Sequence, residues 1–140
     1  MNLERMKYLE NFTHNVGLSD HSLANKDGII ASKLAIYLGA KLIERHFTIL
    51  PENETRDGPV SINEDQLKDL VNYSKLTNAE QEKVITKEYP NWKILLGRSD
   101  RNLSKVELLN RDYYRGRFAS PRNSSINGLN MIYNWEEVQI

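Results

Sequence analysis

Residues 16–49 contain the feature that most limits the folds open to this chain, because two strand-like segments flank one amphipathic helix. The first segment reads VGLSDHS and the second reads KLIERHFTI, and each carries a histidine toward its end. Between them apolar residues recur at helical spacing, and Gly39 stands where a helix-terminating glycine belongs. A strand, a helix and a strand in this order form a crossover unit, so we expect the two strands to be parallel and adjacent.

Each of these two segments carries a polar row along one face. Side chains alternate between the faces of a strand, so Ser19 and His21 share one face of the first segment. Glu44 and His46 share one face of the second segment for the same reason. A parallel sheet usually buries both faces, and a buried polar row is costly unless it binds or catalyses something. The pattern therefore indicates a functional site on this face.

Three blocks of sequence, GLSDHS, GAKLIERHFTI and DGPVSINEDQL, occur in an order that resembles the sialic acid (N-acetylneuraminate) synthase family. The resemblance covers residues 3–76 and matches the family's last two strand and helix units. It implies an α/β fold in which residues 1–76 form the C-terminal portion of a (β/α)8 TIM barrel. Residues 77–140 are then a helical and irregular C-terminal extension.

The resemblance also implies an activity. Family members condense phosphoenolpyruvate with an N-acylated amino sugar, such as an N-acylmannosamine, to form a sialic or other nonulosonic acid. Six barrel strands have no counterpart in this chain, so we expect a complementary barrel half or a homo-oligomer as partner. The alternative from another functional class is a non-catalytic remnant that serves as an assembly subunit. A synthase that acts on a different amino sugar is a third interpretation.

The resemblance assigns roles to individual residues. It makes His21 and His46 ligands of a divalent metal ion, and it makes Ser19 a contact to phosphoenolpyruvate. A single histidine is more often structural than ligating, but two in register on one face favour a metal site. Glu44 is a third ligand, a group that orients an imidazole, or one partner of a salt bridge. Two imidazoles and a carboxylate suit Mn²⁺ best, with Mg²⁺, Co²⁺ or Fe²⁺ as alternatives.

A polar loop with two prolines follows the second strand. In the family this loop commonly reads G-P-D, and its aspartate binds hydroxyl groups of the amino sugar. Here Val60 follows Gly58 and Pro59, so the sugar contact transfers only weakly to Asp57. A turn-stabilising role for Asp57 is the alternative. No residue of the chain is assigned as a catalytic acid or base.

Local signals predict where the helices begin. Asn25 or Asp27 suits the N-cap of the crossover helix, and Asn63 suits the N-cap of the next helix. Thr77 and Glu80 form a capping box for the helix that follows.

The apolar and charged residues around the site also carry expectations. Leu67, Leu70 and Val71 are expected to form the buried stripe of the helix after Asn63. Phe47 and Ile49 are expected to pack against outer helices. Asp20 should cap the next loop or orient a neighbour, and Arg45 should reach solvent or a carboxylate.

Composition excludes several classes of function. The 140 residues have a net charge of zero, so no electrostatic footprint indicates nucleic acid or an anionic membrane as partner. The arginine and tyrosine residues of segment 110–123 are more consistent with packing and ion pairs than with a nucleic-acid surface. The absence of cysteine and of a long apolar run is typical of a soluble, cytoplasmic protein.

Overall fold

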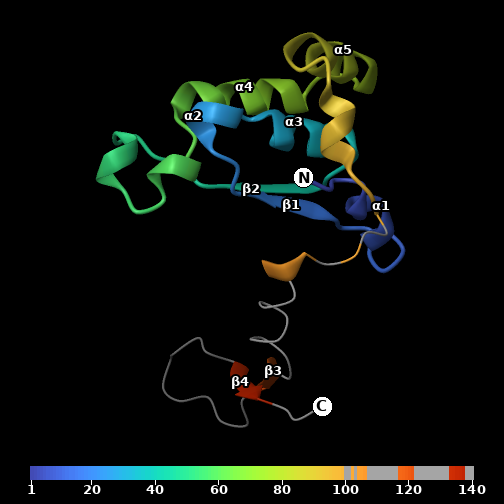
Figure 1. Cartoon of the computed structure of the whole chain (residues 1–140), viewed down its shortest axis with the longest axis vertical. Helices are drawn as coiled ribbons and strands as arrows, with labels where there is room; N and C mark the ends of the chain where they lie inside the picture. The colour runs from blue at the N-terminus through green and yellow to red at the C-terminus, as the bar shows by residue number, and fades with distance from the viewer. Residues whose placement is uncertain (100–101, 103, 107–116, 122–132, 138–140) are drawn as a thin grey trace. The chain divides into compact units, whose positions relative to one another are not determined.

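The computed structural model describes residues 1–99, 102, 104–106, 117–121 and 133–137, which Figure 1 draws in colour. The chain divides into two compact units, Met1–Asp100 and Arg101–Ile140. In the second unit β3 (Arg117–Pro121) pairs antiparallel with β4 (Tyr133–Glu137). Most of segment 110–123, including the tyrosines of its arginine-rich stretch, lies outside the described residues.

The first unit is built on a pair of parallel strands. β1 (Gly17–Asp20) pairs with β2 (Leu42–Arg45) in a register that sets Ser19 beside Glu44 and Asp20 beside Arg45. A Cβ atom at Gly17 would lie 2.6 Å from the Leu42 carbonyl oxygen, so the strands approach closely only because this residue is glycine. The prediction of adjacent parallel strands is confirmed.

The crossover between the strands consists of two helices rather than one. α2 (Ala24–Asp27) ends at Gly28, whose φ of 60° lies in the left-handed region, and α3 (Ile30–Tyr37) begins after Ile29. Asn25 and Asp27 therefore lie inside α2, and their prediction as the N-cap of the long helix is wrong. Gly39 follows the α3 C-cap with a φ of 98°, which confirms its helix-terminating role.

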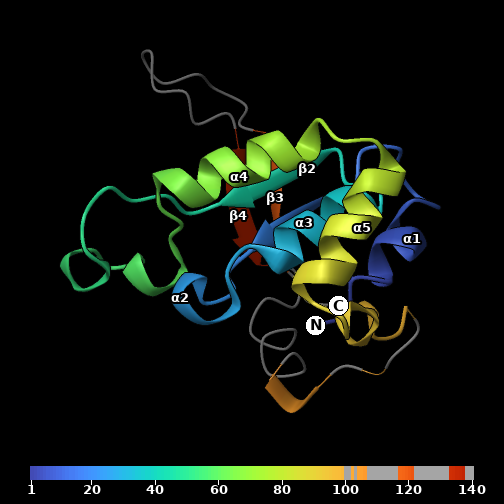
Figure 2. The same cartoon turned by 90° about the horizontal axis from the view of Figure 1, so that it is seen from above.

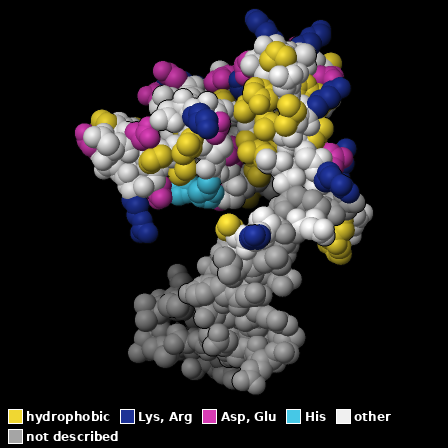
Figure 3. Space-filling view, in the orientation of Figure 1, with side chains coloured by type: hydrophobic (Ala, Val, Ile, Leu, Met, Phe, Trp, Pro, Cys, Tyr) yellow, Lys and Arg dark blue, Asp and Glu magenta, His cyan; other side chains and the backbone are white. Residues whose placement is uncertain are grey.

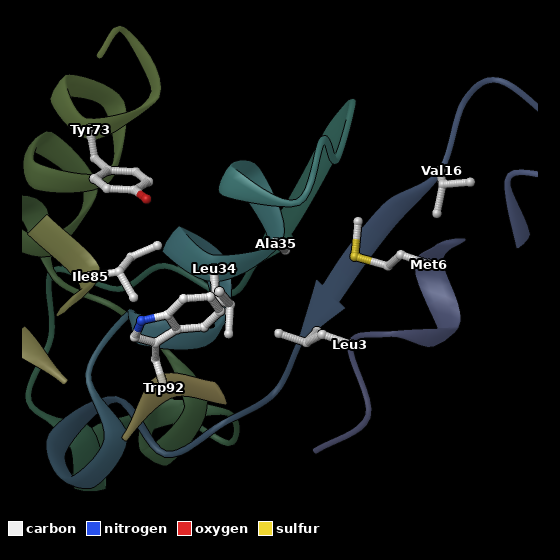
Figure 4. Packing of buried hydrophobic residues seen from close by; sticks show 8 residues of the cluster. All are labelled: Leu3, Met6, Val16, Leu34, Ala35, Tyr73, Ile85 and Trp92. Atoms are coloured by element: carbon white, nitrogen blue, oxygen red, sulfur yellow. The ribbon is translucent and has the colours of Figure 1, made fainter. Parts of the chain in front are cut away.

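Helices cover one face of the sheet (Figures 1 and 2). α3 packs on both strands, and α4 (Glu64–Ser74) and α5 (Asn78–Glu88) pack on α3. Side chains from the segment before β1, from all three helices and from Trp92 meet in one apolar cluster, drawn in Figure 4. Its members are Leu3, Met6, Val16, Leu34, Ala35, Tyr73, Ile85 and Trp92. These elements confirm the α/β class, with the layer order of a strand and helix crossover.

Both predicted capping signals are present. The Asn63 side chain accepts a hydrogen bond from the Gln66 amide while Gln66 returns one to the Asn63 amide. Thr77 and Glu80 form the same arrangement at the start of α5. These reciprocal bonds satisfy amides that a helix start otherwise leaves unpaired.

The apolar expectations were only partly correct. Leu70 is buried, but Leu67 and Val71 are exposed, and Tyr73 takes the second buried position of α4. Ile49 is 84% exposed and Phe47 is also exposed, so neither packs under outer helices of this unit. The alternation of side chains identified the two faces of β1 and β2 correctly. Phe47 and Ile49 follow β2, and no helix of the described residues covers them.

The two ends of the first unit are joined by backbone hydrogen bonds. Leu3 donates to the carbonyl of Leu95, and Glu4 donates to that of Leu96, which pairs the start of α1 (Arg5–Leu9) with η3 (Trp92–Leu96). Gly97 has a φ of 58°, and a Cβ atom there would meet the Asn2 side chain at 2.3 Å. Segment 92–99 is therefore held against the N-terminal residues of the first unit.

Lys33 ties the three covering helices together. Its side chain, on α3, is 2% exposed. Its ammonium nitrogen lies 2.8 Å from a carboxylate oxygen of Asp69 on α4 and 2.8 Å from one of Glu88 on α5. Burial disfavours the charged amine, but the two carboxylates outweigh this effect and raise the pKa of Lys33. The buried cation therefore remains paired and charged at neutral pH.

We predict that Lys33→Met lowers the free energy of unfolding by about 2 kcal/mol, because it removes charge-assisted bonds and leaves two carboxylates facing each other. Urea denaturation followed by circular dichroism measures this. Lys68→Met is the matched control, since Lys68 and Glu64 form an exposed pair, for which we expect less than about 0.5 kcal/mol. Equal losses in both variants would contradict the role given to Lys33.

We also predict that the first unit loses stability in alkaline solution. Burial raises the pKa of the Tyr73 hydroxyl, and nearby Glu88 adds to the effect, so both Tyr73 and Lys33 hold their protons more tightly when folded. Their stabilisation is complete below the ordinary values of 10.0 and 10.5 and is lost as the pH rises through the higher folded values. Lys33→Met and Tyr73→Phe should each flatten the curve of unfolding free energy against pH above about 10. An unchanged slope in both variants would refute this account.

Candidate metal centre

The candidate site lies where β1 and β2 end. His21 directly follows β1 and His46 directly follows β2, so the parallel register places the two residues side by side. The face that carries Ser19 and Glu44 is exposed, whereas the opposite face, with Asp20, packs toward α3. The prediction that the polar row shares one face is confirmed. Histidine side chains are visible at the surface of this unit in Figure 3.

The two imidazoles converge on one point. His21 Nε2 lies 3.0 Å from His46 Nε2, and the ring centroids are 4.8 Å apart. Glu44 joins them, because one ligand atom from each of the three residues lies within 4.8 Å of the others. The residues that the sequence selected as a possible two-histidine, one-carboxylate set therefore form one cluster.

The donor set suits a divalent ion. Two imidazole nitrogens that bind one ion at about 2.1 Å in neighbouring octahedral positions lie about 3.0 Å apart, and the separation here is 3.0 Å. Imidazole nitrogens and carboxylate oxygens are both ligands of divalent metal ions in proteins. The three clustered residues therefore fit a divalent metal ion.

The other two predicted residues stand behind the imidazoles. Ser19 Oγ is 3.5 Å from His21 Nδ1, and Asp57 Oδ2 is 3.7 Å from His46 Nδ1. Both distances exceed those of a good hydrogen bond, but each oxygen faces the Nδ1 side of its ring. An oxygen beside Nδ1 favours the tautomer with its proton on Nδ1, which leaves Nε2 free to bind an ion. Oxygen partners of metal-bound histidines commonly have this effect. Asp57 therefore lies beside the site, as well as in the turn before η2 (Gly58–Val60).

A buried ion pair lies beneath the histidines. Arg45 Nη1 is 2.6 Å from Asp20 Oδ1, and the two side chains are 3% and 1% exposed. Burial alone raises the pKa of the Asp20 carboxyl, but hydrogen bonds from Ser32 and Ser22 and the charge of Arg45 outweigh it and lower that pKa. Of the expected alternatives, Asp20 both caps its loop and pairs, and Arg45 reaches a carboxylate rather than solvent. The sequence pattern that could have indicated this ion pair is the position of Asp20 and Arg45, each of which directly precedes one histidine.

The loop after β2 is anchored to the site at its far end. Ile62, just before α4, donates from its amide to the His46 carbonyl at 2.8 Å and accepts from the Thr48 amide at 3.1 Å. Gly58 is buried against the Glu52 carbonyl of η1 (Glu52–Glu54), where no Cβ atom would fit. These contacts hold Asp57 near His46 although the chain between them is long and polar.

Comparison with known proteins identifies relatives of this chain. The chain is 39% identical to the spore coat polysaccharide biosynthesis protein SpsE of Bacillus subtilis over 106 residues, which are 75% of this chain and 27% of that protein. It is 40% identical over 72 residues to pseudaminic acid synthase of Campylobacter jejuni, covering 51% of this chain and 20% of that enzyme. This chain thus spans between a fifth and just over a quarter of the length of these curated relatives.

A solved structure and a family model give the same result. The crystal structure of Bacillus subtilis SpsE superposes with a TM-score of 0.58 at 36% identity, over 86% of this chain and 33% of that one. The model of the NeuB family matches residues 1–86, which include both strands, both histidines and α4. The resemblance seen in the sequence blocks is confirmed, and this chain belongs to the NeuB family.

Proposed function

We propose that this chain forms the metal-binding part of a NeuB-type synthase that condenses phosphoenolpyruvate with an N-acylated amino sugar. The observation that carries the proposal is the His21, Glu44 and His46 cluster at the C-terminal ends of adjacent parallel strands. Barrel enzymes place their chemistry at that end of the strands. The relatives are a pseudaminic acid synthase and a polysaccharide biosynthesis protein, which supports a nonulosonic acid as product.

In the proposed reaction C3 of phosphoenolpyruvate attacks the aldehyde carbon of the open-chain sugar, water adds at C2, and phosphate leaves. His21 and His46 would hold the ion, with Mn²⁺ the first choice and Mg²⁺ or Co²⁺ as alternatives. A bound divalent ion supplies Lewis-acid polarisation of the aldehyde oxygen, which is worth several kcal/mol in such reactions.

The remaining site residues would act on substrate and on ring orientation. Ser19, exposed beside His21, would contact phosphoenolpyruvate, and Asp57 would contact sugar hydroxyls. Glu44 would complete the ligand set or orient a histidine ring, since it belongs to the same cluster. Ser19 and Glu44 are exposed on the same face of the sheet, where a substrate would be accessible to them.

We further propose that a complementary barrel half completes the site. β1 and β2 form a sheet of only two strands in the described first unit, and its polar face is uncovered. Leu42 is 69% exposed on that face, which is unusual for a leucine in a parallel strand. Added strands would pair both outer edges and bury this face. The absence of cysteine is compatible with the cytoplasm as the proposed compartment.

We predict saturable Mn²⁺ binding to the chain in isothermal calorimetry, lost in His21→Ala and in His46→Ala because each removes one imidazole ligand. His14→Ala is the control, since His14 is the third histidine of the chain and is not in the cluster. In the same series Glu44→Gln separates two roles. A loss as large as that of a histidine variant indicates direct ligation, whereas a small loss indicates an orienting role.

We predict that activity requires the added strands. The chain would be co-expressed with the part of Bacillus subtilis SpsE that precedes its match to this chain, and phosphate release from phosphoenolpyruvate measured. The assay includes N-acetylmannosamine and the amino sugar precursor of pseudaminic acid. We expect Mn²⁺-dependent turnover that His46→Ala abolishes. A stable complex that binds Mn²⁺ without turning over any sugar would instead support the non-catalytic assembly subunit.

A further inference from the structure

We infer that the buried Asp20 and Arg45 ion pair is the device that positions His21 and His46 for metal binding. The inference rests on the proposed function for the metal itself, but its geometric content concerns the metal-free chain. Neither residue belongs to the cluster of His21, Glu44 and His46, so both are positioning residues rather than ligands. Each immediately precedes one of the two histidines.

The guanidinium group of Arg45 holds the backbone on both sides of His21. Nη1 donates to the Asp20 carbonyl oxygen at 3.1 Å and to Ser22 Oγ at 2.9 Å, and Nη2 donates to the Ser22 carbonyl oxygen at 2.8 Å. The Asp20 carbonyl belongs to the peptide unit before His21, so Arg45 restrains that unit and also the residue that follows His21. The peptide unit after His21 is held by Asp20 itself, whose Oδ1 accepts a hydrogen bond from the Ser22 amide at 2.9 Å. The ion pair thereby restrains the backbone on both sides of His21.

Asp20 connects the same pair to the helix layer. Its Oδ2 accepts a hydrogen bond from Ser32 Oγ on α3 at 2.6 Å, and its Oδ1 accepts one from the Ser22 amide at 2.9 Å. Asp20 and Ser32 are buried, so these bonds are protected from water. The pair therefore fixes the end of β1 to α3 as well as to β2.

The geometry shows why such restraint matters for an ion. The Nε2 atom lies at the far end of the side chain, so a small rotation of the backbone moves it by much more than the 0.2 Å that metal distances tolerate. Since the pair is neutral as a whole, it also places no net positive charge behind the proposed cation site. A lone guanidinium would provide the restraint and repel the ion.

The test compares four variants of the full chain. Arg45→Met removes the restraint, and Asp20→Asn with Arg45→Met removes both charges, which relieves the unpaired buried carboxylate. Arg45→Lys keeps the charge beside Asp20, but an ammonium group lacks the forked geometry of the guanidinium group. It cannot bond the Asp20 carbonyl, Ser22 Oγ and the Ser22 carbonyl in the way that Arg45 does. Lys33→Met is the matched control, because Lys33 is a buried cation whose paired carboxylates, Asp69 and Glu88, lie on α4 and α5.

Two readouts are used beside urea denaturation. The first is the nuclear Overhauser effect between the ring protons of His21 and His46 in the metal-free chain, whose centroids are 4.8 Å apart. With three histidines in the chain, the ring signals can be assigned by substitution. The second is the Mn²⁺ dissociation constant from calorimetry.

We expect Arg45→Met to lose the ring-to-ring signal and to weaken Mn²⁺ binding by about 10-fold or more, as loss of an orienting group does. The double variant should regain stability without regaining either property, and Arg45→Lys should be intermediate in both. Lys33→Met should lose stability while its ring signal and Mn²⁺ affinity stay unchanged.

The inference is overturned if the ring signal persists in folded Arg45→Met or in the folded double variant. It is equally overturned if Lys33→Met changes the ring signal as much as Arg45→Met does, because the effect would then follow stability alone. If the unsubstituted chain shows the ring signal but binds no Mn²⁺, the proposed metal function fails. The positioning role is then still decided by the ring signals of the variants.

Discussion

The parallel register of β1 and β2 is the constraint on which the rest of the first unit depends. By setting Asp20 beside Arg45, it forms the buried ion pair and brings the following residues, His21 and His46, together. A slip of one residue would turn Arg45 toward the open face and bury Glu44 against α3. The strand pairing, the ion pair and the histidine cluster are therefore consequences of a single alignment.

α3 contributes residues both to the packing of the helices and to the support of the site. On one side its Lys33 pairs with carboxylates from α4 and α5, and on another its Ser32 holds the Asp20 carboxylate. Both contacts are polar groups in a buried helix, and both are satisfied by specific partners, as burial requires. Ser32 thus links α3 to the residue that precedes His21. The helix layer contributes to the site although no helical residue belongs to the cluster.

Helices cover one face of the sheet, and the other face is exposed in the described first unit. The helix side has a packed core, whereas the opposite side presents Ser19, Glu44 and an exposed Leu42 beside the histidines. In a barrel such a face would be the interior, with the cluster at its catalytic rim. The NeuB-family relatives are much longer than this chain, which corresponds to between a fifth and just over a quarter of their length. Under the proposed function the metal ligands would come from this chain and the remainder of the site from the complementary barrel half.

Local pattern by itself determined the parallel strand pair, the polar face with its two histidines, the glycine that ends α3, the N-cap at Asn63 and the capping box of Thr77. These features depend on periodicity and on contacts within a few residues, so the sequence contains the information directly. The tertiary structure decided what covers each face. It exposed Ile49, split the crossover at Gly28, and buried Arg45 against Asp20. Such outcomes depend on which distant segments pack together, and alternation along a strand identifies a face without identifying its neighbour.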